Sequence, residues 1–267
     1  MSSDSRCDGD DSQTVHLHLQ VLDQQRTITL NVAAGDGPIG DVLPVARQLS
    51  EQLTAIGIET AARDGRQVSC RAGCGACCRQ LVAISLPEAM ALADVVAAMP
   101  PERQVVVRRR FAEALDRLEA NGLLEPKQPD RDRYLTQPTA AGRSVAAPLA
   151  QRYFRQGIAC PFLEEESCSI YADRPLVCRE YLVTSPAEDC DRLFETPVER
   201  VELPVRVGNV MVQLAHRVGG APCETIPLVL ALEFAEAHRD EFKELHRGLD
   251  LVAELVSETA AEQRRGS

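Results

Sequence analysis

The placement of cysteines is the feature that most limits how this chain can fold. Eight of its ten cysteines fall in two short segments that lie far apart in the sequence. A thiolate centre that drew on both segments would close a long loop, which is entropically costly without a metal ion. The first segment reads Cys70-Arg-Ala-Gly-Cys74-Gly-Ala-Cys77-Cys78, and the second contains Cys160, Cys168, Cys178 and Cys190.

The start of the chain bears on the redox state of these thiols. Residues 1–20 are polar and lack the apolar stretch of a secretory signal, so we expect a cytoplasmic protein. Cytosolic conditions disfavour structural disulfides, so metal ligation is favoured over regulatory disulfides or merely buried cysteines. A zinc site and a 4Fe–4S cluster each take four ligands, so eight thiols would fill one site with spares or two sites. The predicted metal ligands are Cys70, Cys74, Cys77, Cys78, Cys160, Cys168, Cys178 and Cys190.

The first segment has the composition of a ligating loop. Gly73 and Gly75 permit left-handed backbone, and they expose amide N–H groups that can hydrogen-bond to thiolate sulfur. Cys77 and Cys78 are adjacent, so we do not expect both to ligate one ion in relaxed geometry. One of them is expected to serve a second site or act as a redox thiol.

Arginines flank the cysteines on both sides. Arg79, Arg174 and Arg179 are candidate cofactor-binding residues, because they would neutralise cluster charge or bind an anionic substrate. The alternative is ordinary ion pairing with nearby acidic residues. Tyr171 and Tyr181 flank Cys178 and are expected to pack around the site.

The other candidate ligands are weaker. Cys7 lies in a polar lead and is interpreted as a free thiol, while Cys223 precedes an expected helix and is an optional extra ligand. His16 and His18 share one face of an expected strand and are interpreted as a surface pair. We identify no catalytic residue from the sequence.

The cysteine pattern is similar to that of a known family. The chain resembles the CxxCxxCC (YkgJ-type) family of zinc- or iron-chelating domains, to which the cysteine domain of flagellin lysine N-methylases is related. This resemblance covers residues 68–190 and implies a metal or iron–sulfur centre. It is carried by Cys74-Gly-Ala-Cys77-Cys78-Arg79, Cys160-Pro-Phe-Leu, Cys168-Ser-Ile-Tyr171, Arg174-Pro175 and Cys178-Arg179.

Several functions remain open at this point. A thiolate-bound cluster favours an iron–sulfur oxidoreductase or electron-transfer protein. The resemblance also implies two alternatives, a protein-lysine N-methylase that would need S-adenosylmethionine and a non-enzymatic zinc- or iron-chelating module. The spacing of Cys70, Cys74 and Cys77 matches that of radical S-adenosylmethionine enzymes, but no run of alternating strands and helices follows.

Charge and hydropathy limit the partners. The formal net charge is −11, and such an acidic chain repels nucleic-acid phosphates. The most apolar stretch, residues 81–99, is interrupted by charged residues and by proline, so we expect no membrane partner. The partner is therefore expected to be a protein or a small molecule of unknown identity.

Hydrophobic periodicity predicts a mainly α (α+β) protein with a small N-terminal hairpin and an irregular cysteine-rich core. We expect a disordered lead (1–13), a hairpin and helix (14–66), a metal-binding domain (67–190) and a C-terminal helical segment (191–267). Strands are predicted at 14–21 and 26–32, with a short one at 81–85. Helices are predicted at 41–56 with Asp41 as N-cap, and at 87–98, 101–121, 142–156, 207–217, 226–239 and 240–261. Ser85 and Glu88 are predicted to form a capping box at the start of the helix at 87–98.

Overall fold

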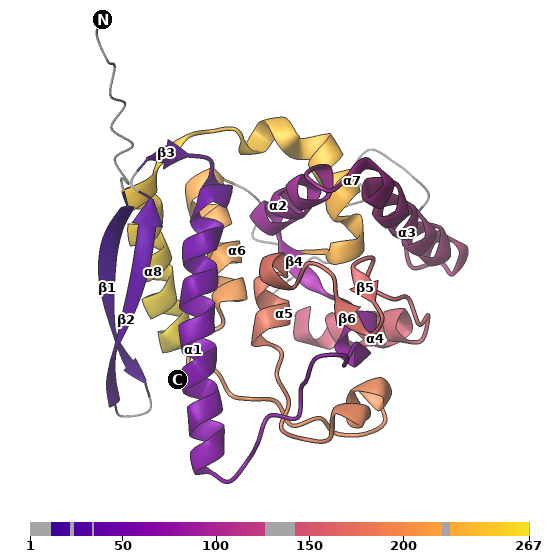
Figure 1. The fold of residues 1–267 in the computed structure, drawn as a ribbon, viewed down its shortest axis with the longest axis horizontal. Coiled ribbons are helices and arrows are strands. Elements are labelled where there is room, and N and C mark those ends of the chain that lie inside the picture. Colours follow the sequence, from indigo (N-terminus) through magenta and orange to yellow (C-terminus); the bar gives the residue numbers. More distant parts are fainter. Residues whose placement is uncertain (1–11, 22–23, 34, 126–141, 221–224, 267) are drawn as a thin grey trace, which may run out of the picture.

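The protein is mainly α-helical with small β-ribbons, as the sequence predicts (Figure 1). The computed structural model describes residues 12–21, 24–33, 35–125, 142–220 and 225–266, and the following statements concern these residues. The strands that it contains form four separate two-stranded antiparallel sheets. None of its helices is long and apolar enough to cross a membrane.

The N-terminal hairpin is confirmed. Strand β1 (Ser12–Val21) pairs with β2 (Gln24–Ala33), with Leu17 opposite Ile28. Alternate residues such as Leu17 and Ile28 are buried, whereas His16 and His18 are exposed, as the period of two predicts. The strand begins at Ser12, so the predicted disordered lead is wrong for residues 12 and 13, and residues 1–11 lie outside the described part.

The first long helix differs from its prediction at both ends. Asp41 lies inside a 3₁₀ turn, η1 (Ile39–Val42), and α1 runs from Leu43 to Arg63. Asp41 is therefore not the N-cap, because the turn begins after Pro38 and passes directly into the helix. The helix continues beyond residue 56 through Gly57, against which segment 201–203 packs, since an added Cβ would lie 2.8 Å from the carbonyl oxygen of Glu202.

The helices that follow the first cysteine segment agree with the sequence. Strand β4 (Ala83–Ser85) leads into α2 (Leu86–Ala97) through the predicted capping box of Ser85 and Glu88. Helix α3 (Pro101–Ala120) ends before Gly122, whose φ of +60° is left-handed. Helix α4 (Gly142–Phe154) ends two residues before its predicted end.

The C-terminal helices are shorter than predicted. Helix α6 (Val207–Gly219) agrees, but α7 (Ala231–His238) starts five residues late because β7 (Thr225–Pro227) pairs with β4. Likewise α8 (Gly248–Gly266) starts late, after η7 (Arg239–Phe242) and β8 (His246–Arg247), which pairs with β3 (Asp36–Gly37). In both places backbone N–H and C=O groups hydrogen-bond to a distant strand instead of within a helix. Local hydrophobic periodicity does not reveal such pairing.

One main core unites the two ends of the chain. It contains buried side chains of the hairpin, α1, α2, α6, α7 and α8, including Leu30, Leu49, Met211 and Leu255. Figure 1 shows the hairpin beside α8 and α1, and the elements of the second cysteine segment on the far side of α1. This core therefore supports the cysteine-rich region from one side.

Candidate metal centre

The two cysteine segments lie against each other. The first passes through a loop into η2 (Ala76–Arg79), and the second comprises β5 (Leu163–Glu164), β6 (Ser167–Cys168), α5 (Leu176–Glu180) and η5 (Ala187–Arg192). The backbone N–H of Cys160 donates to the carbonyl of Cys78 at 2.7 Å, and that of Ser69 to the carbonyl of Val183 at 3.0 Å. Main-chain bonds therefore fix the relative position of thiols far apart in sequence.

A close approach at Gly75 strengthens this docking. Gly73 has a left-handed φ of +80°, as predicted, but Gly75 has φ −92°, so the left-handed prediction for Gly75 is wrong. Gly75 is needed for space instead, because an added Cβ would lie 2.5 Å from Glu166 Oε2 and 2.7 Å from Leu163 Cδ1. Arg79 bridges the same junction, donating to the carbonyl of Gly75 at 3.0 Å and to both Glu166 oxygens at 2.6 and 2.9 Å.

The thiols form one electrostatic neighbourhood centred on Cys77. Burial is the largest cause that raises the thiol pKa of each of five other cysteines, and the charge of Cys77 adds to it every time. Burial brings the pKa of Cys160 to about 12 and that of Cys190 to about 11. The five are Cys70, Cys160, Cys168, Cys178 and Cys190.

Cys77 itself is held by its neighbour. A hydrogen bond with Cys78 is the largest cause that raises the pKa of Cys77, ahead of burial. The side chains of the adjacent Cys77 and Cys78 therefore contact each other directly. Whether both thiols can ligate one ion stays a prediction from the sequence. The charge of Cys74 adds to the burial that raises the pKa of Cys70 and of Cys190.

The described thiols stand near one another without forming a closed ligand shell. Among the residues that the structure describes, no three or more cysteine, histidine, aspartate or glutamate side chains form a group that could hold a metal ion. The electrostatic couplings divide six of the thiols into two groups, and Cys77 is coupled to both groups. One group contains Cys70, Cys74 and Cys190, and the other contains Cys160, Cys168 and Cys178.

The chemistry of the donor set fits a thiophilic metal. All eight cysteines of the two segments carry free thiols. Backbone N–H groups donate to several sulfurs, from Val183 to Cys70 Sγ at 3.5 Å and from Phe162 and Ile170 to Cys160 and Cys168. Amide N–H groups aimed at sulfur stabilise thiolates and are typical of cysteine-ligated metal sites.

The three candidate arginines occupy different environments. Arg179 is buried and pairs with Glu51 at 2.7 Å, and Arg79 pairs with Glu166, so both make the ordinary ion pairs that were the alternative interpretation. Arg174 faces the thiols, since its charge lowers the pKa of Cys70, Cys77 and Cys168, against the burial that raises each of them. Within the described structure the buried Nε of Arg174 has no hydrogen-bond partner.

The two tyrosines also differ. Tyr171 is 64% exposed and lies under the Arg174 guanidinium, whose central carbon is 4.0 Å from the ring centroid, so its expected packing around the site is wrong. Tyr181 packs near Ala76 and Cys190 and accepts a hydrogen bond from Gln80 at 3.2 Å. Tyr181 therefore forms part of the wall around the thiols.

The remaining sequence candidates lie elsewhere. His16 and His18 are hydrogen-bonded to Thr29 and Thr27 on the hairpin, which agrees with a surface pair. Cys7 and Cys223 lie outside the described residues.

Two buried carboxylates, Glu88 and Glu180, position the cysteine elements, and the sequence did not indicate this role for either. Glu88 accepts bonds from Ser85 N and Oγ and, at 2.7 Å, from the N–H of Leu176, so it caps both α2 and α5. Glu180 accepts from Val207 N at 2.6 Å and caps α6, and burial raises its pKa to about 7. The capping-box pattern revealed the local role of Glu88, but no sequence signal marks its second partner.

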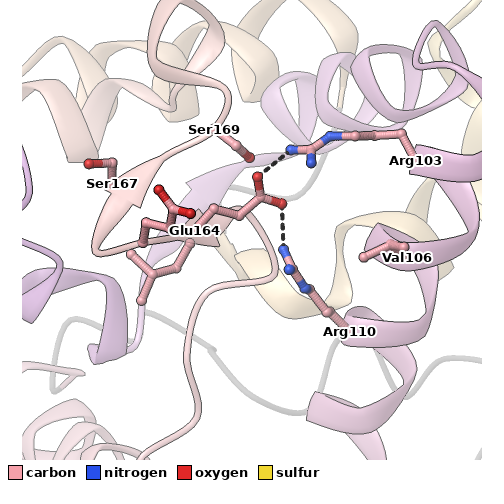
Figure 2. Close-up of a pocket in the computed structure, with 8 residues that line it drawn as sticks. Arg103, Val106, Arg110, Glu164, Ser167 and Ser169 are labelled. Atoms are coloured by element: carbon pink, nitrogen blue, oxygen red, sulfur yellow. Dashed lines mark hydrogen bonds and ion pairs between the residues drawn. The ribbon is translucent and has the colours of Figure 1, made fainter.

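A surface hollow lies beside the second segment. Arg103 and Arg110 of α3 each bind Glu164 of β5 at 2.8 Å, and Figure 2 shows the carboxylate held between the two guanidinium groups. The hollow has a volume of about 670 Å³, and Glu165, Ser167 and Ser169 also line it. The clamp fixes β5, and hence the hairpin that carries Cys168, against α3.

Comparison with known proteins identifies the segment. Residues 69–196 match the model of the CxxCxxCC family, which is described as a "putative zinc- or iron-chelating domain". This match confirms the resemblance inferred from the cysteine pattern. No curated protein and no solved structure matches the chain. The match supports metal chelation and says nothing about a reaction, a cluster type or a methyl donor.

Proposed function

We propose that residues 69–196 bind an iron–sulfur cluster through cysteine thiolates and that the protein transfers electrons. The observation that carries this proposal is the docking of the two cysteine segments, in which the Cys160 N–H donates to the Cys78 carbonyl at 2.7 Å and a Cys77 thiolate would repel thiolates of both segments. A cation placed among these thiols would replace their protons and relieve the mutual repulsion of the thiolates. When bound, an iron–sulfur cluster supplies one-electron redox chemistry.

The donor set favours a cluster over a single zinc ion. Zinc and a 4Fe–4S cluster each take four ligands, so the eight free thiols suit either, and the hydrogen bonds to the sulfurs favour the cluster. The backbone N–H groups aimed at Cys70, Cys160 and Cys168 are the contacts through which proteins adjust a cluster's reduction potential. We assign Arg174 the role of offsetting thiolate charge, because its charge acts on three of the sulfurs.

The proposal is tested on protein purified without oxygen. We expect iron and acid-labile sulfide, with visible absorption that bleaches under dithionite. Cys77→Ser and Cys74→Ser should each lower the iron content and the soluble yield together, because metal binding and folding share one free energy. Cys7→Ser is the matched control and should retain the iron of the wild-type protein.

The possible results separate the two parts of the proposal. A colourless protein with bound zinc would overturn electron transfer and retain chelation. Unchanged metal content and stability in both variants would overturn the ligand assignment itself.

A further inference from the structure

The two outer edges of the N-terminal hairpin differ in whether their backbone groups are hydrogen-bonded. On the outer edge of β2, Gln48 and Gln52 of α1 act as a substitute strand. The Gln52 side chain accepts from Thr29 N at 3.3 Å and donates to Thr29 O at 2.8 Å. Gln48 does the same for Asn31 at 3.0 and 3.3 Å, so this edge is closed to another strand.

The outer edge of β1 has no such cover. Thr29 and Asn31 direct their backbone groups away from β1, so their cross-strand partners His16 and Thr14 direct theirs away from β2. No residue in the described part of the chain hydrogen-bonds to these outward backbone groups of β1. Within the described residues, the outward N–H and C=O groups of the ten-residue strand β1 are therefore unpaired.

The sequence of β1 lacks the features that usually block strand addition. Residues 12–21 contain no proline, lysine, arginine, aspartate or glutamate, and β1 pairs with β2 without a bulge. Val15 of β1 is half buried against the main core, so part of its apolar side chain is left for contact with an incoming strand. The edge is thus suited to pair with another uncharged strand.

We propose that β1 pairs with β1 of a second copy of this chain and extends the two hairpins into a four-stranded antiparallel sheet. An antiparallel pair of identical strands is two-fold symmetric, so each copy satisfies the same groups of the other. Charge selects this orientation. Four aspartates precede β1 in the sequence, at positions 4, 8, 10 and 11, and a parallel pair would bring both sets together, whereas an antiparallel pair separates them.

Two substitutions test the interface on the full chain. His16→Pro removes an outward N–H and spares the ladder between β1 and β2, since proline is tolerated on an edge strand. His16→Lys places a charge at the open edge. Thr29→Lys is the matched control, because it adds the same charge to the exposed face of the strand whose edge is closed.

Sedimentation velocity and amide hydrogen exchange are the measurements. We expect a dimer for the wild-type chain and for Thr29→Lys, and a monomer for both His16 variants, all with wild-type metal content. In the wild type, exchange at Thr14 and His16 should slow as protein concentration rises. A monomeric wild type, or exchange at these amides that is independent of concentration, overturns the proposal, as does a dimer in both folded His16 variants.

Discussion

The carboxylate of Glu88 offers the sharpest test of how the fold positions the cysteines. Glu88 is 5% exposed and accepts three hydrogen bonds, two from Ser85 at 2.9 and 2.6 Å and one from Leu176 N at 2.7 Å. It therefore joins the start of α2 to the start of α5, the helix that carries Cys178. We predict that Glu88→Ala destabilises the protein and lowers its metal content together.

The magnitude follows from the groups left without a partner. The substitution orphans the buried N–H groups of Ser85 and Leu176, and each unsatisfied buried donor costs about 1–3 kcal/mol. The expected loss is therefore about 2–6 kcal/mol, which lowers the melting temperature by roughly 2–4 °C for each kcal/mol in a chain of this size. Metal content falls because α5 loses the bond that fixes its first turn, two residues before Cys178.

Two control variants separate local capping from the long-range link. Ser85→Ala removes one hydroxyl donor but leaves the bond to Leu176 N, so it should cost only about 1 kcal/mol and retain the metal. Glu102→Ala removes an exposed first-turn carboxylate of α3 and should change neither quantity. Thermal unfolding by circular dichroism and metal analysis give the two readouts. If Glu88→Ala behaves like Ser85→Ala in both, Glu88 does not couple α2 to the thiols.

Two further changes test the docking of the cysteine segments and the buried carboxylate of α5. Gly75→Ala should lower the melting temperature and the metal content, because the new Cβ would clash with Glu166 and Leu163. Gly40→Ala is the control, since no atom lies within 4 Å of the added Cβ and no clash is expected. Equal effects of the two substitutions would refute the steric explanation. Burial raises the pKa of Glu180 to about 7, so the folded state holds this proton more tightly than the unfolded state, for which the ordinary value is 4.5. The stability that this proton contributes is complete below pH 4.5 and is lost as the pH rises through about 7. Glu180→Gln should remove that loss, so urea unfolding at pH 5 and pH 8 should show a smaller pH dependence in the variant, and an unchanged dependence would refute the assignment.

Local sequence signals predicted those parts of the fold that depend on neighbouring residues. The hairpin, the capping box at Ser85 and the left-handed Gly73 all arise from backbone preferences and side-chain contacts within a few residues. The late starts of α7 and α8 could not be predicted, because strand pairing with distant residues takes their first backbone groups.

The candidate metal site likewise has features that the sequence predicts and features that only the tertiary structure reveals. The sequence by itself determined which side chains are candidate ligands, because thiol number and spacing depend only on the order of residues. Only the tertiary structure decided that Cys77 is electrostatically coupled to both groups of thiols, that Arg79 and Arg179 pair with Glu166 and Glu51, and that Glu88 holds α5. These facts depend on distances between residues far apart in the chain, and burial and packing of the whole core set such distances.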